Sequence, residues 1–339
     1  MINFNVVSVS SLACAALLAA STVQAEKGNV EEIQFYAPST RVEFISLLAR
    51  NVEKKARDNH VLYHFFEADN SAKTQLEILN TNKKPNISYV VRACDGLEHQ
   101  KLIDVVKNNK ATMVFLPNEI PQKVIDYYDN AWQVSKDNLE EGAALAATVI
   151  SYVKAHPECD KNKNGSIETF IVHGPKKHVA EIARNKKVKE YFSKVKTDFN
   201  IVGEVYADWY FEQAYSAIEK TFDDESFNDI ELIVSMNDAM ALGCIDAIEQ
   251  HSFETGKDIA IPPIFGVDAL RSALVMIKDG KMTATISTDA GKIAEIAYNV
   301  AMGVHDFEEL SKIAGFPIDS RKITVKPTVY TKKNLPDVF

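Results

Sequence analysis

Short apolar segments alternate with segments of helical periodicity along almost the whole chain, and this order limits the possible folds more than any other feature. In the first part, the strand-like segments are Glu32–Ala37, 61–66, Ile87–Val91 and 111–116. When helices connect successive strands, the strands run parallel and the helices cover both faces of the sheet. The sequence therefore predicts an α/β fold with a parallel sheet.

The same order begins again after Asn138. A helix that extends to Ala155 is followed by strand-like segments at 169–173, 200–206, 231–235, 259–267 and 283–287. The chain has 339 residues, which suits two domains of about 150 residues better than one core. We therefore expect two doubly wound, Rossmann-like α/β lobes. No low-complexity linker separates them, which favours a hinge over a flexible tether.

The N-terminus has the pattern of an export signal. The first 25 residues contain no Asp, Glu, Lys or Arg, and an apolar run from Val6 to Ala20 precedes the sequence Val23-Gln24-Ala25, which fits a signal-peptidase site. An uncleaved anchor is disfavoured because the run is shorter than the roughly 20 residues that cross a bilayer. Lipidation at Cys14 is the weaker alternative, because Cys14 lies in the middle of the apolar run. We expect residues 1–25 to be cleaved on export.

The composition excludes several classes of function. A net charge of −9 repels phosphate backbones, and no dense Lys/Arg cluster offsets it, so we expect no binding of nucleic acid. The chain has no Gly-x-Ser-x-Gly turn, no phosphate loop and no His/Cys cluster with metal spacing, so we expect no enzyme. Cys94, Cys159 and Cys244 remain after cleavage, and we expect them to be buried apolar side chains rather than disulfides.

Candidate ligand contacts follow the strands of the second half. In open α/β sheets, ligands bind beyond the carboxyl ends of the strands. The residues found there are His178, Arg184, Trp209, Asn237 and Asp268. An aromatic plane together with forked polar groups suits a sugar, whose C–H faces pack on rings and whose hydroxyls pair with such groups. The alternatives are structural, because Asn237 can cap a helix, Trp209 can lie in the core and Arg184 can face solvent.

A loop at 160–168 has the opening pattern of a calcium loop. Oxygen-bearing side chains stand at alternate positions from Asp160, and Gly165 is sixth. A complete EF-hand would have Glu at the twelfth position, which is Ile171 here. The loop is therefore not an EF-hand. From the residues alone it is either a calcium site that needs a carboxylate from elsewhere or an Asn/Lys-rich surface turn.

Three segments of the second half carry a resemblance to a known family. They are Met-Asn-Asp-Ala-Met-Ala at 236–241, Phe-Gly-Val-Asp-Ala-Leu at 265–270 and, more loosely, Thr-Ile-Ser-Thr-Asp-Ala at 285–290. With these segments the chain resembles the bacterial periplasmic galactose/glucose-binding proteins over almost the whole mature sequence. The resemblance implies the fold of a type 1 periplasmic binding protein, whose lobes are joined by a three-segment hinge.

The resemblance also implies the boundaries of the lobes. The N-terminal lobe would comprise residues 26–116 and 290–322, and the C-terminal lobe would comprise residues 117–289 and 323–339 with the calcium loop. The hinge would pass near 116–118, 288–290 and 320–324.

The family's site residues match this chain in part. Sugar contacts are implied at His178, Arg184, Trp209, Asn237 and Asp268, with Phe44 as the stacking ring of the N-terminal lobe. A Ca²⁺ ion is implied, with side-chain ligands from Asp160, Asn162, Asn164, Glu168 and Glu231 and the backbone carbonyl of Ser166. In the family, a Glu at the position of Glu231 supplies the carboxylate that the loop itself lacks.

Several family contacts are absent. The acidic residue expected shortly before Phe44 is missing, Arg92 stands where Asn is expected, and Ala180 and Thr288 replace an Asp and an Asn. Each lost contact leaves a sugar hydroxyl without its partner, at about 1–3 kcal/mol. Arg92 either adds a positive donor that suits an acidic or otherwise modified sugar or simply reaches solvent.

The resulting hypothesis is a monomeric periplasmic receptor that passes a galactose- or glucose-like monosaccharide to the membrane subunits of an ABC transporter, with a chemoreceptor as a second partner. The alternatives are the same scaffold with a changed specificity, and a sensing protein that has lost hexose binding. A sugar-responsive repressor is disfavoured because an export signal stands where a DNA-binding helix-turn-helix would be.

Overall fold

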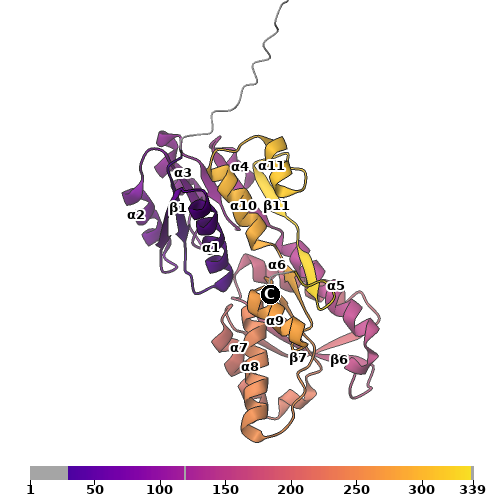
Figure 1. The fold of residues 1–339 in the computed structure, drawn as a ribbon. Helices are drawn as coiled ribbons and strands as arrows, with labels where there is room; N and C mark the ends of the chain where they lie inside the picture. Colours follow the sequence, from indigo (N-terminus) through magenta and orange to yellow (C-terminus); the bar gives the residue numbers. More distant parts are fainter. Residues whose placement is uncertain (1–29, 118–119, 337–339) are drawn as a thin grey trace, which may run out of the picture.

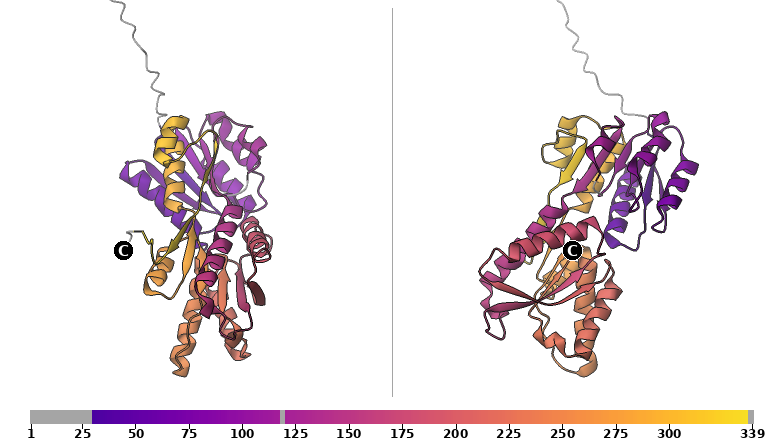
Figure 2. Two further views of the ribbon diagram at one scale, coloured as in Figure 1. Left: turned by 90° about the vertical axis from the view of Figure 1, so that its right-hand side faces the viewer. Right: turned by 180° about the vertical axis from the view of Figure 1, so that it is seen from behind.

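Two α/β lobes, each built around a six-stranded sheet, make up the part of the chain that the computed structural model describes, residues 30–117 and 120–336 (Figure 1). The expected export signal at 1–25 lies outside the described residues. Figure 2 shows from two further sides that the lobes are stacked along the long axis of the molecule. The two-lobed fold predicted from the alternating pattern is thus confirmed.

The sheet of the N-terminal lobe has the order β11-β5-β4-β3-β1-β2, and all its paired strands are parallel. Its strands are β1 (Glu32–Ala37), β2 (Leu62–Glu67), β3 (Ile87–Val91), β4 (Met113–Phe115), β5 (Ala131–Lys136) and β11 (Lys322–Val325). Its helices are α1 (Glu43–Asp58), α2 (Ala72–Asn82), α3 (His99–Val106), α4 (Gln122–Ile125), α10 (Ala290–Ala301) and α11 (Phe307–Ala314), with a short 3₁₀ turn at Lys107–Asn109.

The sheet of the C-terminal lobe has the order β12-β10-β9-β8-β6-β7, and only β12 runs antiparallel to its neighbour among the described strands. Its strands are β6 (Ser166–His173), β7 (Asp198–Tyr206), β8 (Leu232–Ser235), β9 (Ile264–Val267), β10 (Ala284–Ser287) and β12 (Thr328–Thr331). Its helices are α5 (Asn138–Ala155), α6 (Val179–Phe192), α7 (Phe211–Asp223), α8 (Asp238–Thr255) and α9 (Arg271–Asp279), with 3₁₀ turns at Pro157–Cys159 and Ser226–Asp229.

Strand β1 shows why the N-terminal sheet is covered on both faces. All six of its residues are buried. Ile33 and Phe35 belong to a core that includes residues of α1 and α10, whereas Tyr36 belongs to a second core that includes residues of α2 and α3. Alternate residues of a strand point to opposite faces. A strand that is buried on both faces needs helices on both sides, as in doubly wound folds.

The chain crosses between the lobes three times, and two crossings differ from those expected. The first follows β5, which pairs with β4 and β11, so residues 120–136 belong to the N-terminal lobe. The crossing between β10 and α10 agrees with the expected segment 288–290. The third lies between β11 and β12, so residues 323–325 also belong to the N-terminal lobe. The expected crossings near 116–118 and 320–324 are corrected accordingly.

The physical reason for the first error lies in the sequence of β5, Ala-Trp-Gln-Val-Ser-Lys, which mixes apolar and polar residues. Gln133 and Ser135 are nevertheless buried, and the strand pairs with β4 on one edge and with β11 on the other. The strand is held by its position in the sheet rather than by its own apolar pattern.

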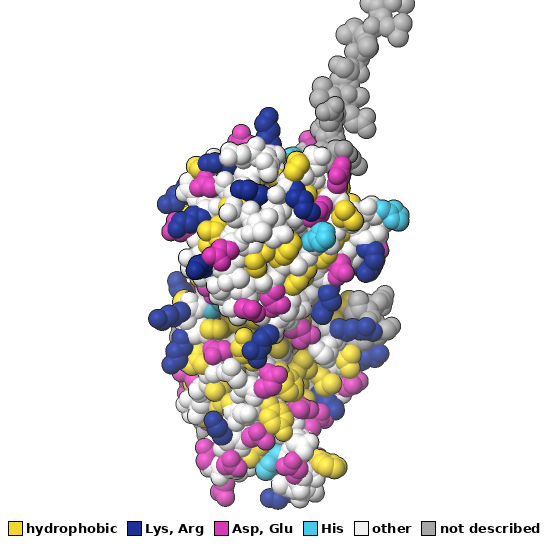
Figure 3. Space-filling model, turned by 90° about the vertical axis from the view of Figure 1, so that its left-hand side faces the viewer, with side chains coloured by type: hydrophobic (Ala, Val, Ile, Leu, Met, Phe, Trp, Pro, Cys, Tyr) yellow, Lys and Arg dark blue, Asp and Glu magenta, His cyan; other side chains and the backbone are white. Residues whose placement is uncertain are grey.

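Acidic and basic side chains are interspersed over the face of the molecule drawn in Figure 3. Cys94, Cys159 and Cys244 are buried, as expected. Within residues 30–117 and 120–336, no helix combines the length and the apolar character needed to cross a membrane.

Candidate functional site

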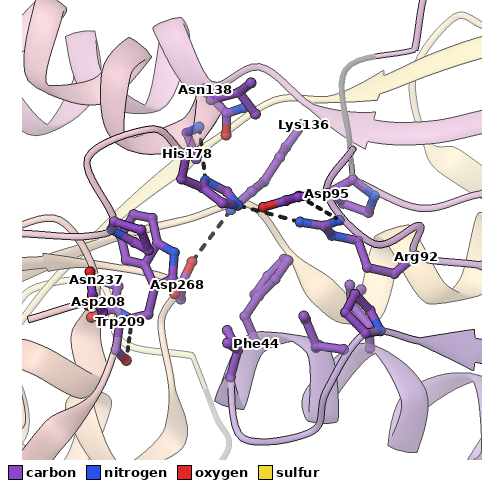
Figure 4. Close-up of a pocket in the computed structure, with 18 of the residues that line it drawn as sticks. Phe44, Arg92, Asp95, Lys136, Asn138, His178, Asp208, Trp209, Asn237 and Asp268 are labelled. Carbon is purple, nitrogen blue, oxygen red and sulfur yellow. Dashed lines mark hydrogen bonds and ion pairs between the residues drawn. The ribbon is translucent and has the colours of Figure 1, made fainter. Parts of the chain in front are cut away.

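A cleft of about 430 Å³ lies between the two lobes. Its size falls in the range of pockets that hold small molecules. The cleft is lined by all seven predicted contact residues, namely Phe44, Arg92, His178, Arg184, Trp209, Asn237 and Asp268. All of these except Arg184 are labelled in Figure 4. They come from both lobes. Phe44 and Arg184 lie in helices α1 and α6, and the others lie in the segments that follow parallel strands, which is where ligands of open α/β sheets bind.

Trp209 is held in the cleft wall by its backbone and by a close glycine. The turn after β7 gives Asp208 and Trp209 positive φ angles of 49° and 73°. Gly174, just after β6, packs so closely on the indole that a Cβ there would lie 2.3 Å from the ring. Trp209 is only 8% exposed. The indole is therefore both packed and a cleft-lining surface, so the two interpretations made from the sequence are compatible.

Asn237 likewise has two roles. Its Oδ1 accepts a hydrogen bond from the backbone N–H of Met240 at 2.9 Å and so caps α8, while its Nδ2 donates to the carbonyl of Trp209 at 3.3 Å. An amide carries two donor hydrogens and two acceptor lone pairs. Asn237 can therefore also pair with a ligand hydroxyl at the cleft, which it lines.

Asp268 sits on a strained loop behind which a second carboxylate is buried. Asp268 and Ala269 have positive φ angles of 114° and 47°, which residues other than glycine rarely adopt. The loop is supported by Asp238, whose carboxylate accepts from the N–H of Leu270 at 2.9 Å and from the hydroxyl of Thr285 at 2.7 Å. This support holds the Asp268 carboxylate at the cleft.

A cluster of buried charges lies beneath the cleft. Lys136 Nζ is 3.1 Å from Glu141 and 3.5 Å from Asp268. Arg184 donates to Glu141 Oε2 from Nε at 3.0 Å and from Nη2 at 2.7 Å, and its Nη2 is 3.7 Å from Asp268. Thr288 donates its hydroxyl to the other oxygen of Glu141. Each of the four charged side chains is at most 8% exposed.

The cluster fixes the charge of Glu141. Burial opposes ionisation, but the two cations Arg184 and Lys136 outweigh it and lower the pKa of Glu141 to about 2. Because Glu141 binds Arg184 with a forked pair of hydrogen bonds, the guanidinium serves the cluster rather than solvent. The proposed alternative of a solvated Arg184 is therefore wrong. Arg184 also lies 5.6 Å from the Trp209 ring centre.

Arg92, in the N-terminal lobe, is buried at the opposite side of the cleft from Asn237 (Figure 4). Its Nη1 donates to its neighbour's carbonyl, that of Ala93, and lies 3.7 Å from Asp95. Its Nη2 lies 3.4 Å from Nε2 of His178 in the other lobe. Arg92 does not reach into open solvent, so that alternative is also wrong.

Sequence reasoning missed Lys136, Glu141, Asn138, Asp95 and Asp208. Lys136 ends β5, so a correct prediction of that strand would have marked it as a cleft residue. Asn138, Asp95 and Asp208 line the cleft from loops or the first helical residue. Glu141 carried no signal, because its position in α5 resembles that of any acidic residue in a first helical turn.

The expected calcium loop folds as a compact turn closed by Glu231. Glu231 Oε1 accepts from the N–H groups of Lys161 and Asn162 at 2.6 and 3.2 Å, and its Oε2 accepts from that of Glu168 at 3.2 Å. Gly165, with φ of 86°, makes the sharp turn. Glu231 thus reaches the loop from the position directly before β8.

The remaining loop side chains fit a cation only partly. Asp160 accepts from the N–H groups of Asn164 and Gly165 at 3.1 and 2.9 Å. Burial and a side-chain hydrogen bond with Glu168 raise the pKa of Glu231, which places these two carboxyl groups side by side. However, the amide groups of Asn162 and Asn164 donate to Glu168, so their oxygens would have to turn. Among the described residues no three His, Cys, Asp or Glu side chains form a metal centre.

Known proteins share this architecture. The chain is 28% identical to the D-galactose/methyl-galactoside binding periplasmic protein of Haemophilus influenzae over 273 residues, which cover 77% of this chain and 78% of the relative. An ABC-transporter solute-binding protein of Actinobacillus succinogenes with bound D-allose matches 89% of this chain and 98% of its own, with a TM-score of 0.67 and 20% identity. A Caulobacter myo-inositol binding protein matches 91% and 95%, with a TM-score of 0.66 and 21% identity.

The family match agrees with the architecture of two lobes and an interlobe cleft. It covers residues 33–309 and is described as the periplasmic binding protein domain, a family of binding proteins rather than of enzymes. The chain belongs to this family of periplasmic binding proteins.

Proposed function

We propose that this chain binds one monosaccharide of the galactose/glucose class between its lobes and delivers it to the membrane subunits of an ABC transporter. The observation that carries the proposal is the cleft, in which the rings of Phe44 and Trp209 accompany the buried carboxylate of Asp268. Aromatic rings pack on the C–H faces of a sugar, and carboxylates bind its hydroxyls. The name of the H. influenzae relative supports a galactose-like ligand.

The C-terminal lobe provides most of the groups that would read hydroxyls. Asp268 would accept hydrogen bonds from ring hydroxyls, and Asn237 would both donate and accept them. Arg184 would position Asp268 rather than donate chiefly to the sugar, because its N–H groups already bind Glu141 and the carbonyl of Met236. In the N-terminal lobe Phe44 would stack, with the Lys136 ammonium 4.2 Å from its ring centre.

Delivery would follow from closure of the lobes. A ligand that contacts both lobes favours their closed arrangement by its additional contacts there. The closed form would then dock on the permease, and a chemoreceptor would be a second partner that binds the same form. Export through cleavage after residue 25 would place the monomeric protein in the periplasm, where these partners are found.

Calcium is a separate part of the proposal. The loop at 160–168 and Glu231 would hold one Ca²⁺ through side-chain oxygens of Asp160, Asn162, Asn164, Glu168 and Glu231 and the carbonyl of Ser166. The oxygen-only donor set and the two neighbouring carboxylates support this ion class. The ion would join the loop at 160–168 to Glu231, which directly precedes β8, and none of these residues lines the cleft, so its role would be structural.

The experiment is isothermal titration of the mature chain with D-galactose, D-glucose, D-allose and myo-inositol. We expect saturable binding of one galactose or glucose per chain, because the aromatic and carboxylate contacts suit a pyranose. Asp268→Asn is expected to weaken that binding at least about tenfold, since it removes a charged hydrogen-bond acceptor.

The matched control is Asp246→Asn on the exposed face of α8. It makes the same chemical change outside the cleft, and we expect unaltered affinity. If none of the hexoses binds the calcium-loaded protein, the galactose/glucose proposal is wrong. If Asp268→Asn binds as tightly as the parent protein, the cleft is not where the sugar is held.

A further inference from the structure

The guanidinium of Arg92 is the least compensated cation of the cleft. Lys136 and Arg184 each contact the buried Glu141 and Asp268. Arg92 is equally buried, with 10% of its side chain exposed, but its nearest carboxylate is Asp95, which is 74% exposed and 3.7 Å away. A buried charge without a close counter-charge is costly, and a protein retains it where a ligand supplies the partner.

His178 faces Arg92 with a second donor. The Nδ1 atom of His178 accepts from the N–H of Ala180 at 3.2 Å and thereby caps α6. A neutral ring with an accepting Nδ1 carries its proton on Nε2. Burial, followed by Arg92, lowers the pKa of His178 to about 4, so the ring is neutral at pH 7. The Nε2–H therefore points at Nη2 of Arg92, 3.4 Å away.

Two donors at this distance do not bond to each other, because neither supplies a lone pair. An oxygen acceptor from a ligand would satisfy both, and an anionic oxygen would also neutralise Arg92. In Figure 4 the two side chains lie together, across the cleft from Asn237 and Asp208. The donors of Arg92 and His178 thus lie at one side of the cleft, with the exposed Asp95 beside Arg92, and the hydroxyl-binding side chains of Asp268 and Asn237 lie at the other.

We propose that the natural ligand is a sugar acid, a monosaccharide whose carboxylate is held between Arg92 and His178 while its hydroxyls face Asp268 and Asn237. This inference rests on the proposed function, because it needs a sugar in the cleft. The carboxylate would draw the two lobes together, since Arg92 belongs to the N-terminal lobe and His178 to the C-terminal lobe.

A carboxylate fits the site better than a phosphate. The planar fork of a guanidinium matches the two oxygens of a carboxylate, and one negative charge balances the single weakly compensated cation. A phosphate carries close to two charges at neutral pH. It would lie in a cleft that also holds the carboxylates of Asp95, Asp208 and Asp268, which would repel the second charge.

The test is titration of the mature protein with D-glucuronate and D-galacturonate against D-glucose, D-galactose and glucose 6-phosphate. We expect a uronate to bind at least about tenfold more tightly than its neutral parent sugar, because a charged pair of hydrogen bonds replaces a neutral one. Raising the salt concentration from about 0.05 to 0.5 M should weaken the uronate more than the neutral sugar.

The variant is Arg92→Gln, and its matched control is Arg50→Gln on the exposed side of α1. Arg92→Gln should remove the preference for the uronate while the protein keeps its affinity for a neutral sugar, which shows that it still folds. Arg92→Lys should restore part of the preference, because it keeps the charge and loses the fork. Arg50→Gln should change neither affinity.

Three results would overturn the inference. If neutral hexoses bind as tightly as uronates, or if Arg92→Gln leaves the uronate affinity unchanged, the ligand is not recognised through a carboxylate. The proposed function as a sugar receptor would still stand. If glucose 6-phosphate binds and no uronate does, the site recognises a phosphate and not a carboxylate. Failure of every sugar in the panel to bind would overturn the proposed function and this inference together.

Discussion

Glu141 organises more of the cleft than any residue that faces the ligand space directly. It is fully buried and contacts Lys136 from the N-terminal sheet, Arg184 from α6 and Thr288 from a crossing segment. One carboxylate thus fixes groups from both lobes beside the hinge. A buried carboxylate with two cationic partners is an arrangement whose loss leaves the partners uncompensated.

Replacing Glu141 by Gln should therefore destabilise the protein strongly. We expect the free energy of unfolding to fall by about 3–5 kcal/mol, because Lys136 and Arg184 lose a buried counter-charge. Urea unfolding followed by circular dichroism would measure the difference. The neighbouring Glu140→Gln is the control, since Glu140 is exposed and its loss should cost less than about 0.5 kcal/mol.

The same residue gives a pH dependence with a defined sign. The pKa of Glu141 is lowered from 4.5 to about 2, so its ionised form stabilises the fold fully above pH 4.5. This stabilisation is lost as the pH falls from 4.5 towards 2, because protonation removes the counter-charge. The stability difference between the parent protein and Glu141→Gln should narrow over that range in urea unfolding. A difference independent of pH would show that Glu141 acts without its charge.

At the scale of elements, the local sequence predicted best the strands that are buried on both faces of the sheet. The expected bounds of β1 and β3 agree with the structure, as does helix α5. The expected strand at 259–267 begins only at Ile264, because Pro262 and Pro263 lack the N–H groups that a sheet requires. β5 was missed because its local sequence mixes apolar and polar residues, whereas its pairing with β4 and β11 is set by the tertiary fold.

The residues of the candidate site likewise fall into those that the local sequence predicts and those that only the tertiary fold defines. His178, Trp209, Asn237 and Asp268 follow predicted strands and could be named from strand ends alone. Lys136 could not, because its strand was not recognised. The contacts of Glu141 are set by tertiary packing between α5, α6 and a crossing segment. Which cations are compensated and which are not is likewise visible only in three dimensions.

The calcium loop provides a prediction for a single element. Removing Ca²⁺ with a chelator should lower the melting temperature of the mature protein, because an ion that binds the folded loop stabilises the folded state. Differential scanning calorimetry with and without added Ca²⁺ would measure the shift. Glu231→Gln should abolish the effect of calcium, whereas Glu225→Gln, an exposed change in the preceding loop, should retain it. If chelation leaves the melting temperature of the parent protein unchanged, the loop is a plain surface turn.

At the scale of the whole molecule, the cleft depends on how the lobes approach. Contacts between the lobes at the cleft include the 3.4 Å approach of Arg92 to His178 and the Arg41 guanidinium 5.1 Å from the ring centre of Tyr210. The first of these opposes closure, because donor faces donor. A ligand that supplies the acceptor would turn this contact from unfavourable to favourable and so shift the lobes towards the closed form.

Small-angle X-ray scattering should therefore show a smaller radius of gyration when the cognate sugar is added. The same ligand at about 100 times its dissociation constant should stabilise the protein by about 2.7 kcal/mol, since it binds only the folded chain. Asp268→Asn should need more sugar for both effects. Because closure and binding draw on the same contacts, stabilisation without compaction would mean that the sugar binds one lobe alone, and the bridging role assigned to the cleft would have to be abandoned.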